Sequence, residues 1–190
     1  MKFELAVPEA LELVVGKVLE AIDLGSQMPI VLIDGRAGSG KSTFADSLQQ
    51  SLFREGESLP RLIHMDDLYE GWDGLALGSD YLNRFILSPL SQGTRANWQI
   101  WDWAKSQRTD WREFSGGTPL IVEGCGSISA RSSEEALIRI WLEASEETRR
   151  ARWLEREGGD EMFDSWSAQE LDFYAREKTK SLCDIVVSTD

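Results

Sequence analysis

Residues 29–43 have the sequence PIVLIDGRAGSGKST. Pro29 to Ile33 form a short, apolar and β-branched run between a proline and a glycine, which is typical of a buried parallel strand. Gly35 to Ser42 match the pattern G-x-x-x-x-G-K-[ST]. The glycines allow backbone N–H groups to converge on phosphate oxygens, and the N-terminus of a following helix attracts the same anion. The sequence therefore predicts a phosphate-binding loop between a strand and a helix.

The phosphate-binding loop also specifies a nucleotide and a metal. In such a loop Lys41 reaches the β- and γ-phosphates of ATP, and the Ser42 hydroxyl binds Mg²⁺. We expect a helix over residues 41–53 and ATP and Mg²⁺ as the cofactors. The residues expected to contact the nucleotide are Gly35, Arg36, Ala37, Gly38, Ser39, Gly40, Lys41, Ser42 and Thr43.

Four further segments share the short, apolar character of this strand, namely residues 61–65, 119–122, 137–142 and 184–187. Helical or mixed segments separate them, which is the βαβ rhythm of a parallel sheet covered on both faces. The sequence predicts an α/β fold, a three-layer sandwich with a five-stranded parallel sheet. The length of 190 residues fits one domain, 1–190.

Two segments depart from this rhythm. Residues 1–28 contain apolar residues at helical spacing and predict an N-terminal helical extension. Residues 70–117 are about twice as long as an ordinary crossover, have no clear strand and carry five tryptophans. We expect a helical insertion that binds an acceptor, although the tryptophans could equally pack the insertion onto the core.

Carboxylates follow two of the predicted strands. Asp66 and Asp67 come directly after one strand, and Glu123 ends another. Because carboxyl ends of parallel strands meet at one edge of the sheet, these groups should lie near the phosphate-binding loop. Asp66 could accept a proton from an attacking hydroxyl, and Asp67 and Glu123 could hold Mg²⁺ with Ser42. Asp67 could instead serve only a local turn.

Residues 145–160 predict a basic helix. Ser145 is a suitable N-cap, and Arg149, Arg152 and Arg156 recur at a spacing that places them on one face. Such a helix can act as an arginine lid that offsets charge on a transferring phosphoryl group. It could also be an ordinary surface helix with ion pairs.

The composition limits the partners. Twenty basic and 33 acidic residues give a net charge of −13, which disfavours a nucleic acid polymer or a membrane surface as partner. Two cysteines and one histidine are too few for a disulfide framework or a histidine-rich metal site. The N-terminus does not resemble a signal peptide, so we expect a cytoplasmic protein, with formation of a homo-oligomer left open.

Together these motifs resemble the uridine kinase-like branch of P-loop kinases over residues 29–187. The resemblance rests on the loop beginning at Ile33, on Asp66 to Tyr69, on Glu123-Gly124, on the arginines and on the final strand. It implies that Asp66 is the catalytic base, that Tyr69 lines the acceptor site, and that Lys41 and the arginines contact the triphosphate. Trp101, Asp102 and Trp103 resemble a triplet of the acceptor site in this family. The insertion lacks the acceptor-site histidine of the family, and Trp153 replaces a lid arginine.

We therefore expect phosphoryl transfer from Mg·ATP to a hydroxyl of a small molecule such as a nucleoside. A nucleoside monophosphate kinase is an alternative, for which the insertion offers Arg84, Arg95, Arg108 and Arg112. A regulatory ATP-binding module with little transfer activity is an alternative from another class, but it would need neither Asp66 nor the lid.

Overall fold

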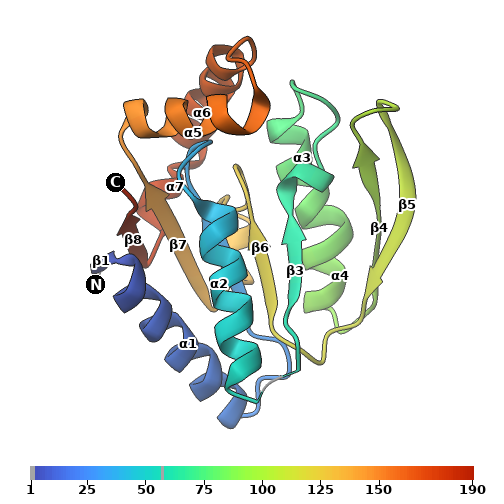
Figure 1. Cartoon of the computed structure of the whole chain (residues 1–190). Coiled ribbons are helices and arrows are strands. Elements are labelled where there is room, and N and C mark those ends of the chain that lie inside the picture. Colours follow the sequence, from blue (N-terminus) through green and yellow to red (C-terminus); the bar gives the residue numbers. More distant parts are fainter. Residues whose placement is uncertain (1–2, 57) are drawn as a thin grey trace.

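Strand β2 (Ile30–Asp34) lies inside a parallel sheet and is buried along its whole length. The computed structural model describes residues 3–56 and 58–190. In it, six parallel strands have the order β1-β8-β7-β2-β6-β3 (Figure 1). The other strands of this sheet are β1 (Phe3–Ala6), β3 (Arg61–His64), β6 (Leu120–Glu123), β7 (Ile138–Glu143) and β8 (Ile185–Ser188).

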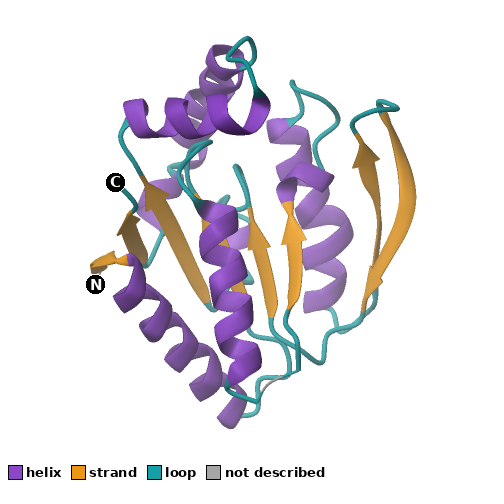
Figure 2. Ribbon diagram, viewed as in Figure 1, coloured by secondary structure: helices purple, strands orange, loops and turns teal. Residues whose placement is uncertain are grey.

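Helices cover both faces of this sheet (Figure 2). Val31 and Ile33 of β2 pack in one apolar cluster with α1 and α2, while Ile30 and Leu32 pack in a second cluster on the opposite face. Successive strand residues point to opposite faces, so one apolar run supplies both layers of the core. The helices are α1 (Val7–Asp23), α2 (Lys41–Arg54), α3 (Leu75–Leu82), α4 (Ser88–Ser91), α5 (Glu146–Glu157), α6 (Phe163–Glu177) and α7 (Thr179–Leu182), with single turns η1 (Met65–Asp67) and η3 (Ser132–Glu134) and a π-helical segment η2 (Asn83–Leu87). The predicted three-layer α/β sandwich is confirmed.

The sheet has six strands rather than the predicted five. The additional strand, β1, pairs in parallel with β8, with Phe3 opposite Ile185. It lies within the predicted N-terminal helical extension, of which residues 7–23 do form helix α1. Strand β1 runs directly into α1, so no turn residue between Ala6 and Val7 marks where the strand ends.

Residues 70–117 contain strands that the sequence did not predict. After α3, η2 and α4, strands β4 (Ala96–Asp102) and β5 (Gln107–Phe114) form an antiparallel hairpin, with Trp98 opposite Arg112. No residue of β5 is buried. The strand therefore lacks the alternation of buried apolar and exposed polar residues by which a strand is recognised in a sequence. The predicted helical insertion is therefore helical over residues 75–91 and carries an unpredicted hairpin over residues 96–114.

The parallel strands bring their carboxyl ends to one edge of the sheet. In Figure 1 the arrowheads of β3, β6 and β7 point toward α5 and α6, which lie across that edge. The loop after β2, turn η1 after β3 and the end of β6 therefore converge there. Within the described ranges, no helix is long and apolar enough to cross a membrane.

Candidate active site

The loop between β2 and α2 has the geometry of an anion cradle. Gly35, Gly38 and Gly40 have φ values of 144°, 80° and 86°. A Cβ at Gly38 would lie 2.4 Å from the backbone oxygen of Arg149, so only glycine fits between the loop and α5. Gly40 precedes α2 without a side-chain cap, which leaves the first N–H groups of α2 for an anion.

Lys41 lies at the start of α2, buried beside this cradle. Its Nζ donates a hydrogen bond to the backbone oxygen of Arg36 at 3.1 Å. Burial lowers the pKa of Lys41, but the neighbouring carboxylates of Glu123, Glu170 and Asp34 outweigh burial and raise it. Lys41 is therefore held as a cation inside the loop.

Glu123 joins the end of β6 to the phosphate-binding loop. Its Oε1 accepts a hydrogen bond from the Ser42 hydroxyl at 3.1 Å and lies 2.6 Å from Nδ1 of His64. The hydrogen bond to Glu123 raises the pKa of His64, the single histidine of the chain. The predicted metal residues Ser42 and Glu123 are thus in direct contact.

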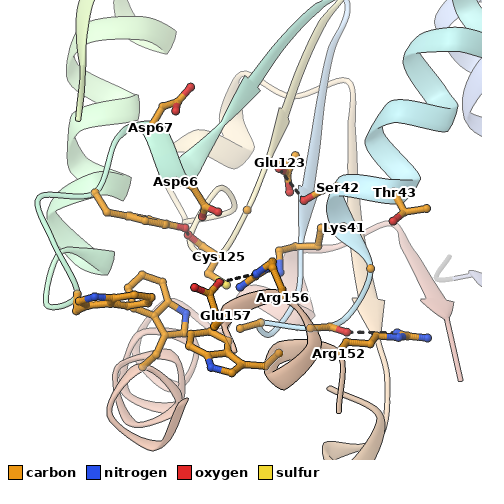
Figure 3. Close-up of a pocket in the computed structure, with 18 of the residues that line it drawn as sticks. Lys41, Ser42, Thr43, Asp66, Asp67, Glu123, Cys125, Arg152, Arg156 and Glu157 are labelled. Atoms are coloured by element: carbon orange, nitrogen blue, oxygen red, sulfur yellow. Dashed lines mark hydrogen bonds and ion pairs between the residues drawn. The ribbon is translucent and has the colours of Figure 1, made fainter. Parts of the chain in front are cut away.

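Turn η1 places Asp66 and Asp67 at the same edge. Figure 3 shows Asp66 directed into the space between Glu123 and Arg156, whereas Asp67 lies at the margin. Burial removes water from around Asp66, and this desolvation, together with the negative charge of Glu123, raises the pKa of Asp66. Desolvation also raises the pKa of Asp67. A carboxyl with a raised pKa is a stronger base, which suits Asp66 to accepting a proton.

A cavity of about 750 Å³ opens between these groups (Figure 3). Its lining includes loop residues, the three carboxylates and five aromatic side chains. We call these five the aromatic wall: Tyr69, Trp72, Trp103, Trp153 and Trp166. The volume is in the range of sites that bind small molecules.

The aromatic wall is assembled from four parts of the chain. The ring centroid of Trp72 lies 5.0 Å from that of Trp103, 5.8 Å from that of Trp153 and 6.2 Å from that of Trp166. Tyr69 packs edge-on against Trp166 at 4.9 Å, and its hydroxyl donates to the backbone oxygen of Cys125 at 2.6 Å. The segment after β3, the β4–β5 turn, α5 and α6 therefore share one apolar surface.

The predicted acceptor residues separate into two groups. Tyr69 and Trp103 line the cavity, and Trp103 donates its Nε1 hydrogen to the backbone oxygen of Asp66 at 2.9 Å. Trp101 pairs with Arg108 within the hairpin, and Asp102 binds Lys105 there at 2.8 Å. Neither residue is part of the cavity lining.

The arginines of α5 also separate. Arg152 and Arg156 line the cavity, where Arg152 donates to the backbone oxygen of Gly38 at 3.3 Å and Arg156 pairs with Glu157 at 2.6 Å. Arg149 is 3% exposed and lies behind the loop, where it donates to the backbone oxygen of Ala37 at 3.3 Å. Burial, together with the nearby Arg36, lowers the pKa of Arg149. Arg149 therefore stabilises the phosphate-binding loop and does not line the cavity.

Several residues of the cavity lining and of the loop contacts were not predicted from the sequence, and three of them lie on α5 and α6. Trp153 was noted only as replacing an arginine, and Trp166 and Glu170 lie on α6, which carries no motif. Glu170 is fully buried, and its Oε1 accepts from the backbone N–H of Ala37 at 2.5 Å. Side chains that reach a site from a late helix depend on tertiary packing, which local sequence does not encode.

The oxygen groups fit a magnesium ion bound with a nucleotide. No cluster of three or more histidine, cysteine or acidic side chains within residues 3–56 and 58–190 could hold a metal alone. Mg²⁺ needs no such cluster, since it keeps several waters and takes its other ligands from one or two side chains and substrate phosphates. The Ser42 hydroxyl and the Glu123 carboxylate are hard oxygen donors of this kind.

Comparison with known proteins agrees with this fold. The family model described as an AAA domain matches residues 31–171. A possible uridine kinase from Bacillus stearothermophilus has a similar structure, with a TM-score of 0.67, 16% identity, and coverage of 95% of this chain and 98% of that chain. A proposed fructose transport system kinase from Silicibacter sp. TM1040 gives a TM-score of 0.60, 20% identity, and coverage of 93% and 98%. No curated protein matches the chain significantly.

At these identities the solved structures establish the fold, and the matched family model spans the phosphate-binding loop, Asp66, Glu123 and the arginine helix. The chain therefore belongs to the AAA domain family and has the fold of a uridine kinase-like P-loop NTPase.

Proposed function

We propose that this protein transfers the γ-phosphoryl group of Mg·ATP to a hydroxyl group of an unphosphorylated small molecule. One observation carries the proposal: Asp66 faces the same cavity as Lys41, so a base and a phosphate-binding cation lie on opposite sides of one space. A protein that only binds ATP needs no base at that position, which favours an enzyme over a regulatory module.

Each side chain has a defined task in this reaction. Lys41 and the first N–H groups of α2 hold the phosphates, and Arg152 and Arg156 offset the charge of the moving phosphoryl group. Asp66 takes the proton of the acceptor hydroxyl as its oxygen forms a bond to phosphorus and the bond to ADP breaks. Ser42 and Glu123, with Asp67 at the margin, would hold Mg²⁺, which supplies charge neutralisation at the phosphate oxygens when bound.

The arginines of the insertion support an unphosphorylated acceptor over a nucleoside monophosphate. Arg95 pairs with Glu113 and Arg108 with Glu70, both at 2.9 Å. The other two contact Phe85 and Asp110 within their own segments. No arginine of residues 70–117 lines the cavity, so the insertion supplies no guanidinium group to bind a phosphate on the acceptor.

The aromatic wall suits an acceptor with a flat apolar face. Trp72 and Trp103 are partly accessible, and either ring could stack on a nucleobase or on the face of a sugar. The two similar structures are a possible uridine kinase and a proposed fructose transport system kinase, so nucleosides and sugars are the first acceptors to examine.

The proposal is tested by ADP release from Mg·ATP with a panel of nucleosides, nucleoside monophosphates and free sugars. We expect one or more unphosphorylated acceptors to stimulate ADP release, and Asp66→Asn to reduce that stimulation by about 100-fold or more. Asp46→Asn, on the exposed face of α2, is the matched control and should leave it unchanged. Stimulation by monophosphates alone would instead identify a nucleoside monophosphate kinase.

A further inference from the structure

Helix α6 contacts both sides of the cavity through one stripe of side chains. Trp166, Glu170 and Tyr174 are spaced by four residues and therefore share a face. Trp166 belongs to the aromatic wall, where it packs against Tyr69 at 4.9 Å. The Tyr174 hydroxyl donates to Oδ1 of Asp34 at 2.7 Å, at the base of the phosphate-binding loop. Glu170, between them, contacts the loop itself.

Glu170 makes three polar contacts although it is fully buried. One carboxylate oxygen accepts from the backbone N–H of Ala37 at 2.5 Å and from the Cys125 thiol at 3.3 Å. The other accepts from Nε of Arg36 at 2.9 Å. A buried carboxylate is stable only where such donors replace water, so the loop and α6 are fitted to each other at this residue.

The N–H group that Glu170 holds belongs to a peptide unit that also contacts Lys41. The carbonyl of Arg36 and the N–H of Ala37 are the two ends of one planar peptide group. That carbonyl accepts the hydrogen bond from Nζ of Lys41 at 3.1 Å. A carboxylate bound to the N–H end fixes the plane of the peptide, and it also polarises the carbonyl toward a cation. Glu170 and Lys41 are thus linked through a single rigid group.

We infer that Glu170 is a positioning residue, which aligns the Arg36–Ala37 peptide so that its carbonyl holds Lys41 in place for the nucleotide phosphates. The role of Lys41 in catalysis rests on the proposed function, but its role in nucleotide binding does not. The inference predicts that removing the Glu170 charge weakens nucleotide binding only while Lys41 is present.

A double-mutant cycle on the full chain tests this link. Binding of Mg·ADP is measured by calorimetry for the wild type, Glu170→Gln, Lys41→Met and the combined variant. We expect Glu170→Gln to weaken binding by about tenfold in the wild-type background and by less than about twofold when Lys41 is already methionine. Asp172→Asn removes a carboxylate from the exposed face of the same helix and should weaken binding in neither background.

A merely structural role for Glu170 would give a different pattern. Equal weakening by Glu170→Gln in both backgrounds, or none in either, would overturn the inference. Glu170→Met provides a second variant if the glutamine variant does not fold, because its side chain fills the space and brings no polar group of its own. Since the cycle needs no phosphoryl transfer, a failure to find any acceptor would count against the proposed function and leave this result standing.

Discussion

Asp34 is a buried carboxylate whose ionisation should make the stability of the protein depend on pH. It ends strand β2, is fully buried, and accepts hydrogen bonds from the backbone N–H groups of Gly35 and Ile128 and from Tyr174. Desolvation by burial outweighs these hydrogen bonds and raises the pKa of Asp34 from 3.8 to about 6. Replacing Asp34 with asparagine removes the titration and keeps the size of the side chain.

The size of the effect follows from the shift in pKa. Between pH 3.8 and about 6 the folded state binds more protons at Asp34 than the unfolded state does, so stability falls as the pH rises. The contribution is fully present below the unfolded-state pKa and is lost as the pH rises through about 6. A shift of about two units corresponds to about 3 kcal/mol in full, of which about half is lost between about pH 5 and pH 8. Asp34→Asn carries a pH-independent cost of about 1–3 kcal/mol, because its amide group cannot accept every hydrogen bond of the carboxylate.

Urea denaturation of the wild type and of Asp34→Asn, over about pH 5 to pH 8, measures this difference directly. We expect the advantage of the wild type in free energy of unfolding to shrink by about 1.5 kcal/mol from the acidic to the basic end. A difference between the two proteins that does not change with pH, or that grows as the pH rises, would refute the assignment of a raised pKa to Asp34.

Three further predictions concern the cavity. The raised pKa of Asp66 predicts that kcat/KM falls as the pH drops through a value above 3.8, since the base must be ionised; a pH–rate profile that Asp66→Asn leaves unchanged would contradict this. Trp72→Leu should raise the KM for the acceptor by about tenfold and leave the KM for ATP unchanged, and an effect on ATP alone would show that the wall serves the donor. Arg149→Met should lower the free energy of unfolding by about 1–2 kcal/mol, as measured by urea denaturation, because Arg149 stabilises the loop. Arg152→Met should mainly lower kcat, because Arg152 lines the cavity. The reverse pattern would place Arg149 rather than Arg152 at the phosphates.

The fold could be predicted from the sequence where local pattern and chemistry coincide. Strand β2, the glycine loop and helix α2 each have a strong local signal, and the four later strands lie within one residue of the predicted segments. Strand β1 was not predicted, because it runs directly into α1 with no turn residue between them to mark its end. The β4–β5 hairpin was missed because β5 is exposed on both faces and therefore has no apolar alternation.

In the candidate site, residues at strand ends could be predicted, whereas residues placed by tertiary packing could not. Asp66 and Glu123 could be placed from their positions at or just after strand ends, because the strand topology brings those ends together. Trp101 and Asp102 were assigned from resemblance alone, and the structure places them within the hairpin instead of at the cavity. Glu170 could not be predicted, since its role depends on α6 packing against a loop more than 130 residues earlier in the chain.

The central claim is that the γ-phosphoryl group moves to a hydroxyl with Asp66 as the base. The most direct measurement follows radiolabelled γ-phosphate from ATP into products, for the wild type and Asp66→Asn, with the acceptor that best stimulates ADP release. We expect the label in a phosphate ester of the acceptor, at a rate that Asp66→Asn lowers by about 100-fold or more. Label recovered only as inorganic phosphate, or transferred equally fast by Asp66→Asn, would contradict the account.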